Sequence, residues 1–328
     1  MKKEKPIGIT GLGMYVPKKV LTNEDLEKMV DTSDEWITTR TGIKKRRIAQ
    51  KGVPSSTLAA EAAKKALADA KLKPDQVDLI IVATITPDMP FPATACFVQA
   101  KIGAKNAACF DVGAACSGFI YGLVCAKNLI SGGMYKNALV IGVEVLSSVT
   151  DWTDRNTCVL FGDGAGAAVL QEVKSGGIVS YYIGSDGTLS NLLYLPGGGS
   201  RHPASKDTLK NKLHCIKMSG TEVFKSAVRL MTDAATHAVC DANLTCKDIS
   251  LLIPHQANIR IINSVRRRIG LPEEKVYLNV EKYGNVSAAS TIMALCEAVK
   301  EKRVKKGDIV VLVAFGAGFT WGSVVIKW

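Results

Sequence analysis

Three residues of types used in acyl-transfer chemistry stand next to small or apolar segments. Cys116 lies among glycine and alanine residues, His255 directly follows an apolar run, and Asn285 directly follows a glycine. A cysteine thiolate can attack an acyl carbon and hold the acyl group as a thioester. Imidazole and amide groups can stabilise the oxygen on which negative charge develops in such reactions. Together the three residue types predict a cysteine-nucleophile reaction in which Cys116 carries the acyl group.

The segment around Cys116 has the pattern of a strand, a tight turn and a helix. Residues 110–112 have the pattern of the end of a buried strand, and an apolar helix is expected through about Ile130. At a helix N-terminus, unpaired backbone N–H groups and the helix dipole favour the thiolate, so we expect a lowered pKa for this thiol. A cysteine in an alanine-rich segment is more often an inert core residue, so this motif alone leaves both interpretations open.

Two further turns could supply polar groups to the same site. His255 opens the polar stretch 255–258 at the carboxyl end of a predicted strand, where α/β proteins build their sites. A structural histidine is the alternative there. Asn285 lies between a glycine and a predicted small-residue helix, so it could cap that helix or donate a hydrogen bond to a developing oxyanion.

A glycine-rich segment, 315–322, follows the predicted strand 309–314. Its glycines would let backbone N–H groups approach a ligand closely. Neither this segment nor 162–166 has GxGxxG or P-loop spacing, so we expect neither dinucleotide binding nor nucleotide hydrolysis.

The elements that must position these residues alternate between strands and helices. Strand-like apolar runs are clearest at 79–84, 138–143 and 309–314. Their alternation with helical patterns predicts an α/β layered fold with a largely parallel sheet. Capping-box spacing predicts helix starts at Thr22 and at Thr32.

A faint internal repeat relates the two ends of the chain. Residues 70–81 align with residues 242–253 at an offset of 172 (242 − 70), and both segments combine a helix end with an apolar strand. This pattern predicts two copies of one α/β unit, residues 1–173 with the cysteine and residues 174–328 with the histidine and asparagine, and an active site between them. Chance similarity of two amphipathic patterns is the alternative.

The composition is that of a globular protein of a reducing compartment. The 328 residues are 47% hydrophobic and include nine cysteines, an odd number with no CxxC spacing. We therefore expect free thiols and a cytoplasmic location. No run of roughly 18 apolar residues exists, and glycines interrupt the N-terminal apolar stretch, so neither a membrane span nor a signal peptide is expected.

The net charge predicts anionic partners. Lys and Arg number 42 against 30 Asp and Glu, which gives a formal charge of +12. The basic residues are dispersed, aromatic residues make up only 6%, and no nucleic-acid-binding signature is present. Acidic or phosphorylated partners therefore fit the sequence as well as nucleic acid does.

Taken together, these motifs resemble those of β-ketoacyl-acyl-carrier-protein synthase III, a family of thiolase-fold condensing enzymes. The resemblance spans nearly the whole chain and depends on separated motifs in the same order, residues 36–43, 113–118, 161–167, 255–258, 284–285 and 318–322. It implies a thiolase-like α/β fold with two similar duplicated halves in a layered α-β-α-β-α arrangement.

The resemblance implies a decarboxylative condensation at the start of fatty-acid synthesis. Cys116 would take a short acyl group from acyl-CoA, with acetyl as the expected primer. Malonyl-acyl-carrier protein would lose CO2, and the resulting enolate, stabilised by His255 and Asn285, would attack the thioester. The amides of Cys116 and Ala317 would stabilise the thioester oxygen, although the family usually has glycine at position 317. The products would be a 3-ketoacyl-acyl-carrier protein, CoA and CO2, formed without a metal or bound cofactor.

Several binding residues follow from the resemblance. Trp36 and Arg155 resemble the pair that encloses the CoA adenine, with Arg40 near the CoA phosphates and Asn258 in the pantetheine tunnel. A core position in a helix is the alternative for Trp36.

The acyl pocket and the partners are implied in the same way. Phe91 resembles a residue that reaches across a homodimer to close the partner's acyl pocket, and a buried loop anchor is the alternative. Met218, Phe224 and Phe315 are also expected at the acyl pocket.

Arg260 and Arg267 lie seven positions apart and so share one face of a predicted helix. The resemblance implies that this face docks the acidic acyl carrier protein. An exposed basic face that is only solvated is the alternative. Neither nucleic acid nor a membrane is an expected partner.

Other functions share part of this pattern. Elongating synthases have a second histidine where Asn285 stands, and degradative thiolases have a second cysteine in the C-terminal glycine loop, where this chain has none. A related condensing enzyme of a specialised, polyketide-type pathway is the first alternative. A cysteine hydrolase, since Cys, His and Asn also form thiol-protease triads, and a non-catalytic acyl-binding paralogue are the others.

Overall fold

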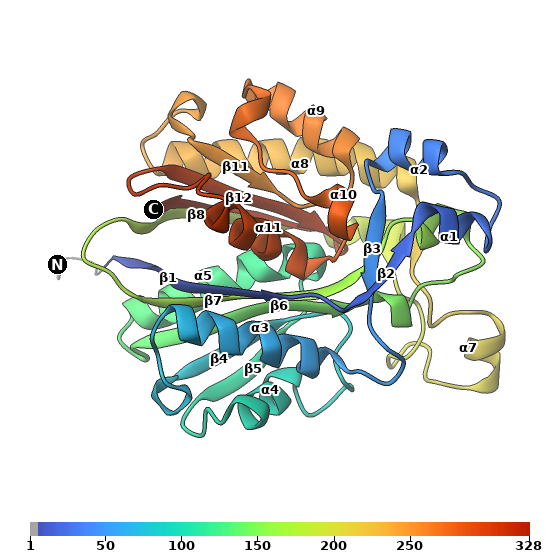
Figure 1. The fold of residues 1–328 in the computed structure, drawn as a ribbon, viewed down its shortest axis with the longest axis horizontal. Helices are drawn as coiled ribbons and strands as arrows, with labels where there is room; N and C mark the ends of the chain where they lie inside the picture. The colour runs from blue at the N-terminus through green and yellow to red at the C-terminus, as the bar shows by residue number, and fades with distance from the viewer. Residues whose placement is uncertain (1–5) are drawn as a thin grey trace.

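The computed structural model describes residues 6–328 and arranges them in five layers (Figure 1). One sheet has the strand order β1-β7-β6-β4-β5, with β1 (Ile7–Tyr15), β7 (Asp163–Glu172), β6 (Asn137–Val145), β4 (Leu79–Ala83) and β5 (Ala108–Val112). The other has the order β11-β12-β13-β8, with β11 (Leu251–Pro254), β12 (Ile309–Gly316), β13 (Thr320–Lys327) and β8 (Gly177–Ser185).

Helices form the remaining three layers (Figure 1). The middle layer, between the sheets, consists of α5 (Gly118–Ser131) and α11 (Ala288–Lys300). The outer layers consist of α3 (Ser55–Asp69) and α4 (Thr94–Ile102) on the first sheet, and α8 (Gly220–Asp241) and α9 (Ile259–Ile269) on the second. The predicted α-β-α-β-α layering is therefore confirmed.

The shorter elements lie around one end of these layers (Figure 1). They are β2 (Lys19–Thr22), β3 (Lys45–Ile48), β9 (Leu193–Tyr194), β10 (Lys217–Met218), α1 (Asn23–Glu27), α2 (Asp34–Thr41), α6 (Arg155–Cys158), α7 (Lys206–Lys210) and α10 (Val280–Tyr283).

The two halves repeat one topology, as predicted. Strands β1, β7, β6 and β4 occupy the positions that β8, β13, β12 and β11 occupy in the second sheet. Within the described residues, one strand of each sheet runs against the rest, β7 in the first and β13 in the second, so both sheets are mixed and the expected largely parallel sheet is wrong. The offset of 172 also matches, because α3 ends at the cap Ala70 and α8 ends at the cap Ala242. The boundary between residues 173 and 174 stays a prediction.

The predicted strands form where the apolar runs are longest. Runs 79–84, 138–143 and 309–314 correspond to β4, β6 and β12, whose residues are almost all buried. Both faces of these strands are covered by helices, which explains why they are continuously apolar and do not alternate.

Glycines let the outer helix α3 lie directly on the edge strand β1. A Cβ on Gly11 would lie 2.4 Å from the Ala66 carbonyl oxygen, and one on Gly13 would lie 2.3 Å from that of Ala62. Only a strand residue without a side chain fits such a contact. The glycines that interrupt the N-terminal apolar stretch therefore serve helix packing.

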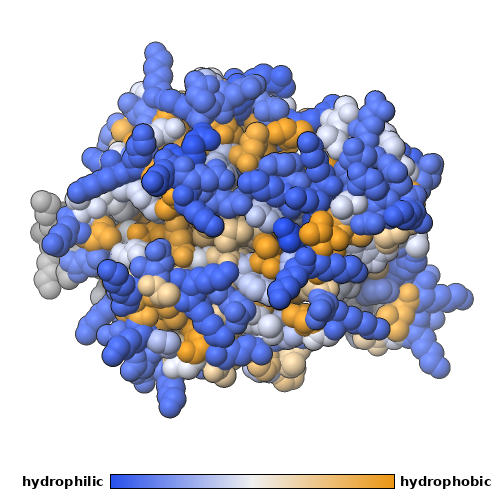
Figure 2. Space-filling model, viewed as in Figure 1, coloured by the Kyte–Doolittle hydropathy of each residue, from blue (hydrophilic) through white to orange (hydrophobic). Residues whose placement is uncertain are grey.

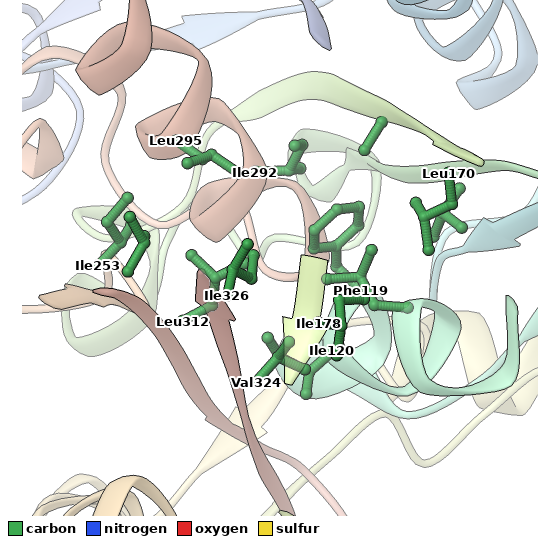
Figure 3. Close-up of a cluster of buried hydrophobic side chains, with 14 of the residues drawn as sticks. Phe119, Ile120, Leu170, Ile178, Ile253, Ile292, Leu295, Leu312, Val324 and Ile326 are labelled. Carbon is green, nitrogen blue, oxygen red and sulfur yellow. The ribbon is translucent and has the colours of Figure 1, made fainter. Parts of the chain in front are cut away.

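The largest buried cluster fills the space between the sheets. Figure 3 shows Phe119 and Ile120 of α5 facing side chains from both sheets, among them Leu170, Ile253, Leu312 and Val324. On the face in Figure 2, hydrophilic residues cover most of the surface and apolar residues form separate patches. Burial between layers thus joins the halves into one core.

Several local predictions can be checked directly. Thr22 caps α1 with the expected capping box, but Ser33, and not Thr32, caps α2, because its side chain accepts the Trp36 N–H. All nine cysteines are free, as predicted. From residue 6 onward, no helix is both long and apolar enough to span a bilayer.

Candidate active site

Cys116 lies in a strained turn that leads into the middle layer. The turn Ala115–Ser117 connects β5 to α5, and Cys116 is 9% exposed. Ala115 has φ +45°, a conformation unusual for a residue with a side chain. The nucleophile candidate therefore lies at the N-terminus of a buried helix, as the sequence predicted.

The N-termini of the two middle-layer helices meet beside Cys116. A Cβ on Gly118, the first residue of α5, would lie 3.7 Å from the Cβ of Ala288, the first residue of α11. Both helices thus direct the positive ends of their dipoles toward the same region. Such a region favours anions, whether a thiolate or an enolate oxygen.

The predicted lowered pKa of Cys116 is wrong for the substrate-free protein. Burial raises the pKa of this thiol to about 12, while the nearby Ser287 hydroxyl acts in the opposite direction. Desolvation disfavours the thiolate more strongly than its neighbours favour it. Cys116 is therefore a thiol at neutral pH before an acyl donor binds.

His255 continues directly from β11. Its backbone N–H donates to the Val313 carbonyl at 2.8 Å, which fixes the residue at the carboxyl end of the parallel pair β11–β12. Burial lowers the pKa of its ring to about 4, so the imidazole is neutral at physiological pH. A neutral ring can donate through one nitrogen only.

Ser290 decides which ring nitrogen that is. The Ser290 hydroxyl lies 2.5 Å from Nδ1 of His255 and also accepts the Gln256 N–H at 3.4 Å. Nδ1 is the only acceptor that the described residues offer to the Ser290 hydrogen, so we assign this hydrogen to Nδ1, which leaves the ring proton on Nε2. His255 therefore presents an N–H donor to the cavity that it lines.

Asn285 is fixed by its backbone and by its side-chain oxygen. Its N–H donates to Leu160 at 2.9 Å, and its carbonyl accepts from Gly162 at 3.0 Å. Its Oδ1 accepts the Ser287 N–H at 2.8 Å, so the amide N–H groups are the end left for the cavity. The capping interpretation is thus incomplete, because the side-chain oxygen stabilises the turn while the amide nitrogen stays available.

One cavity of about 740 Å³ joins these groups. Cys116, His255 and Asn285 all line it. Other predicted residues that line it are Trp36, Arg40, Met218, Phe224, Asn258, Arg260, Phe315 and Ala317. Residues from both halves therefore meet in one cavity.

Three predicted residues do not line the cavity. Arg155 lies beside it, with its guanidinium 4.5 Å from the centre of the Trp36 ring. Phe91 is 83% exposed, so the alternative of a buried loop anchor is wrong. Arg267 is exposed on α9.

The rim of the cavity combines an indole with cations. Trp36 is half-buried and packs against the buried cluster that contains Leu26 and Ile37, which agrees in part with the alternative of a helix core residue. Its ring centre also has the Arg40 guanidinium at 4.9 Å and that of Arg155 at 4.5 Å. Asn258 caps α9 by accepting the Arg260 N–H at 2.8 Å. The rim therefore offers stacking surface and positive charge.

Glu144 is a buried acid near the site that the sequence analysis missed. It accepts the Thr86 hydroxyl at 2.6 Å and the Ile85 N–H at 3.2 Å, and burial raises its pKa to about 7. The Ser287 hydroxyl favours the ionised forms of both this carboxyl and Cys116. The sequence signal was present, since Glu144 is the one charged residue in the apolar run of β6.

Comparisons with known proteins identify the family of this chain. A family model described as 3-oxoacyl-[acyl-carrier-protein (ACP)] synthase III matches residues 110–187, and a model of its C-terminal part matches residues 240–328. A protein of Caldanaerobacter subterraneus subsp. tengcongensis named beta-ketoacyl-[acyl-carrier-protein] synthase III is 60% identical, over 98% of this chain and 97% of that protein.

Solved structures show the same likeness. The structure of 3-oxoacyl-[acyl-carrier-protein] synthase III from Aquifex aeolicus VF5 has a TM-score of 0.91 and 49% identity, covering 98% of this chain and 100% of that one. The priming beta-ketosynthase of the R1128 polyketide biosynthetic pathway has a TM-score of 0.92 and 32% identity, covering 99% and 97%.

Proposed function

The chain belongs to the β-ketoacyl-[acyl-carrier-protein] synthase III family and has the chain-initiating condensation of fatty-acid synthesis as its function, and we propose that Cys116, His255 and Asn285 carry it out. This assignment rests on one observation, that a thiol and two neutral N–H donors line the same cavity. The substrates are a short acyl-CoA, acetyl-CoA first among them, and malonyl-acyl-carrier protein.

In the first half-reaction, the sulfur of Cys116 attacks the thioester carbon of acyl-CoA. The C–S bond to Cys116 forms, the C–S bond to CoA breaks, and the thiol proton leaves Cys116 and ends on the departing CoA sulfur. The amides of Cys116 and Ala317 stabilise the oxyanion that forms between these steps. The methyl group of Ala317 leaves that amide free to donate.

In the second half-reaction, the malonyl group loses CO2, and the electron pair of the broken C–C bond forms an enolate. Nε2–H of His255 and the amide of Asn285 stabilise the enolate oxygen. The enolate carbon attacks the acyl thioester, the C–S bond to Cys116 breaks, and the sulfur leaves as a thiolate that takes a proton from water. Because both donors are neutral, they stabilise negative charge without transferring a proton to the enolate carbon.

CoA binds at the rim formed by Trp36 and its two arginines. Arg40 supplies charge for the phosphates, and Asn258 lies along the pantetheine path. Arg155 contacts Trp36 directly in the substrate-free protein and pairs with Asp31 at 3.6 Å. Adenine therefore enters between Trp36 and Arg155 only when this guanidinium moves away from the ring. No metal or bound cofactor takes part in the proposed steps.

A homodimer would complete the acyl pocket. Strand β5 lies at the edge of its sheet, and the loop after β4 exposes Met89 (44%) and Phe91 (83%). An unpaired edge strand beside exposed apolar side chains favours pairing with a second copy. Phe91 would then close the partner's pocket, whose other walls include Met218, Phe224 and Phe315.

Helix α9 would dock the acidic carrier protein. Arg260 lines the cavity and lies 6.0 Å from the Phe224 ring, and Arg267 is exposed further along the helix. Arg266 is less available, because it pairs with Glu273 at 3.1 Å. Arg260 and Arg267 therefore form the proposed docking face.

The test is turnover with both substrates. Purified protein, acetyl-CoA and malonyl-acyl-carrier protein should yield CO2 and acetoacetyl-acyl-carrier protein in equal amounts. Release of free acetate from acetyl-CoA, without any condensation product, would contradict the assignment.

The hydrolase alternative is disfavoured by the hydrogen bonds. In a Cys-His-Asn protease triad, the asparagine orients the histidine. Here Ser290 holds His255, and Asn285 instead accepts from the Ser287 N–H. A specialised condensing enzyme stays the second candidate, because the R1128 priming ketosynthase shares the fold at 32% identity.

A further inference from the structure

Two hydroxyl groups join the nucleophile turn to the C-terminal glycine loop. The Ser117 hydroxyl lies 2.7 Å from the Thr320 hydroxyl, and these two residues belong to different halves of the chain. Thr320 Oγ1 lies 3.0 Å from the carbonyl oxygens of both Ala114 and Ala317. Ser117 Oγ lies 2.8 Å from the Ala114 carbonyl. The pair thus contacts the backbone of both the nucleophile turn and the C-terminal glycine loop.

A count of hydrogens shows that this hydroxyl pair is satisfied internally. Each hydroxyl has one hydrogen, and each has at least two acceptors within 3.0 Å in this cluster. Ser117 is completely buried. Neither hydroxyl therefore needs a substrate partner, and the pair acts on the backbone around it.

The two loops also touch through their backbones. A Cβ on Gly316 would lie 2.5 Å from the backbone nitrogen of Cys116, and Thr320 pairs with Gly316 across the β12–β13 hairpin. The nucleophile turn contains backbone that its residue type does not favour, φ +45° at Ala115, whereas glycine at position 318 permits the φ of +134° there. Contacts between the loops must therefore hold the Ala115 conformation.

We infer that Ser117 and Thr320 position the amides of Cys116 and Ala317 as one oxyanion hole. This inference rests on the proposed function, in which these amides stabilise the acyl oxyanion. Thr320 is the more important partner, because it alone reaches the carbonyls of both Ala114 and Ala317. Neither residue is catalytic, since neither touches the reacting atoms.

The inference can be tested by comparing two reactions of the same sulfur. Acylation by acyl-CoA forms an oxyanion, whereas alkylation by iodoacetamide displaces iodide at a saturated carbon and forms none. Both rates should be measured at one pH for wild type, Thr320→Val, Thr320→Ser and Ser117→Ala.

Thr320→Val keeps the shape of the side chain and removes the hydroxyl. We expect its acylation kcat to fall by about 10²-fold, the usual cost of a misplaced oxyanion-hole donor, with KM for acyl-CoA and the alkylation rate unchanged. Thr320→Ser keeps the hydroxyl and should restore acylation. Ser117→Ala should lose less, because the one hydrogen of Thr320 still has the Ala114 and Ala317 carbonyls within reach.

Two results would overturn the inference. One is unchanged acylation in Thr320→Val, and the other is an equal fall in acylation and alkylation, which would indicate general damage to the turn. If Thr320→Val does not fold, a selective loss of acylation in Ser117→Ala supports the inference, and no selective loss overturns it. Failure of wild type to become acylated would instead reject the proposed function on which the inference rests.

Discussion

The turns before α5 and α11 hold equivalent positions in the duplicated fold but carry side chains of different chemical types. Cys116 lies two residues before α5 begins, and Asn285 lies three residues before α11 begins. Both turns contain a non-glycine residue with positive φ, Ala115 at +45° and Ser287 at +43°. In the proposed function, one turn presents a nucleophile and the other a hydrogen-bond donor. Duplication therefore supplied the converging helices, and single side chains divided the chemistry between them.

The difference between the turns also appears in their surroundings. In the proposed function, Cys116 belongs to the turn that receives the acyl group. Asn285, His255 and helix α9 are proposed to act on the carrier-bound substrate. We therefore expect changes at Asn285, at His255 and on helix α9 to spare acylation, and the variants below test this expectation.

The largest effect is expected for Asn285→Asp. This change keeps the oxygen that accepts the Ser287 N–H but replaces the amide donor with a carboxylate that repels the enolate. Condensation should fall by about 10²–10³-fold, the range for loss of an oxyanion donor. Acylation of Cys116, followed by mass spectrometry in the same variant, should proceed at the wild-type rate. An equal loss of the condensation and acylation rates would mean that the Asn285 turn is not specific to condensation.

The pH dependence of the Cys116 labelling rate tests the properties of the nucleophile turn. Because burial raises the pKa of this thiol to about 12, its thiolate fraction should rise about tenfold per pH unit up to that pH. Iodoacetamide labelling should therefore accelerate about 100-fold between pH 7 and pH 9. A plateau below pH 8 would show instead that the converging helix N-termini outweigh burial before substrate binds.

Ser290→Ala should have a smaller effect confined to condensation. Loss of its hydroxyl frees Nδ1 of His255 to carry the ring proton, which removes the Nε2–H donor from part of the population. A cost of roughly 1.4 kcal/mol corresponds to about tenfold in rate. Thr291→Val is the matched control, because it removes a neighbouring buried hydroxyl that has no hydrogen-bond partner. If both variants lose the same activity, Ser290 has no specific role at His255.

The smallest effect is expected on the surface, at Arg260. Arg260→Glu should raise KM for malonyl-acyl-carrier protein several-fold, since an acidic partner would meet a reversed charge. Acylation by acyl-CoA should be unaffected. Lys306→Glu makes the same charge change before β12, at the opposite end of that strand from the cavity, and should change neither rate. Equal loss of both reactions in Arg260→Glu would reject the docking role.

Strands, the internal repeat and the glycine turns were predicted from sequence because each depends on residues that are close together in the chain. Apolar runs identified β4, β6 and β12, and the offset between residues 70 and 242 identified the repeated unit. Glycine turns located Cys116 and Asn285. The helix start at Thr32 was wrong by one residue, because Ser33 has a hydroxyl that caps equally well.

The parts that escaped prediction depend on partners distant in sequence. Ser290 meets His255 across 35 positions, and Ser117 meets Thr320 across 203. The thiol pKa was predicted in the wrong direction, because a helix N-terminus is visible in sequence whereas burial of Cys116 is a tertiary property. Glu144 could have been found from its charge within an apolar strand. Its hydrogen bonds to Thr86 and to the Ile85 N–H are tertiary contacts that the strand pattern does not show.

The central claim is that Cys116 carries the acyl group while His255 and Asn285 act on the other substrate. Intact-mass analysis after exposure to acetyl-CoA tests it most directly. We predict that wild type and Asn285→Asp both gain one acetyl group, that Cys116→Ala gains none, and that malonyl-acyl-carrier protein discharges the adduct from wild type much faster than from Asn285→Asp. An acetyl adduct on Cys116→Ala, or none on wild type with any short acyl-CoA, would contradict the account.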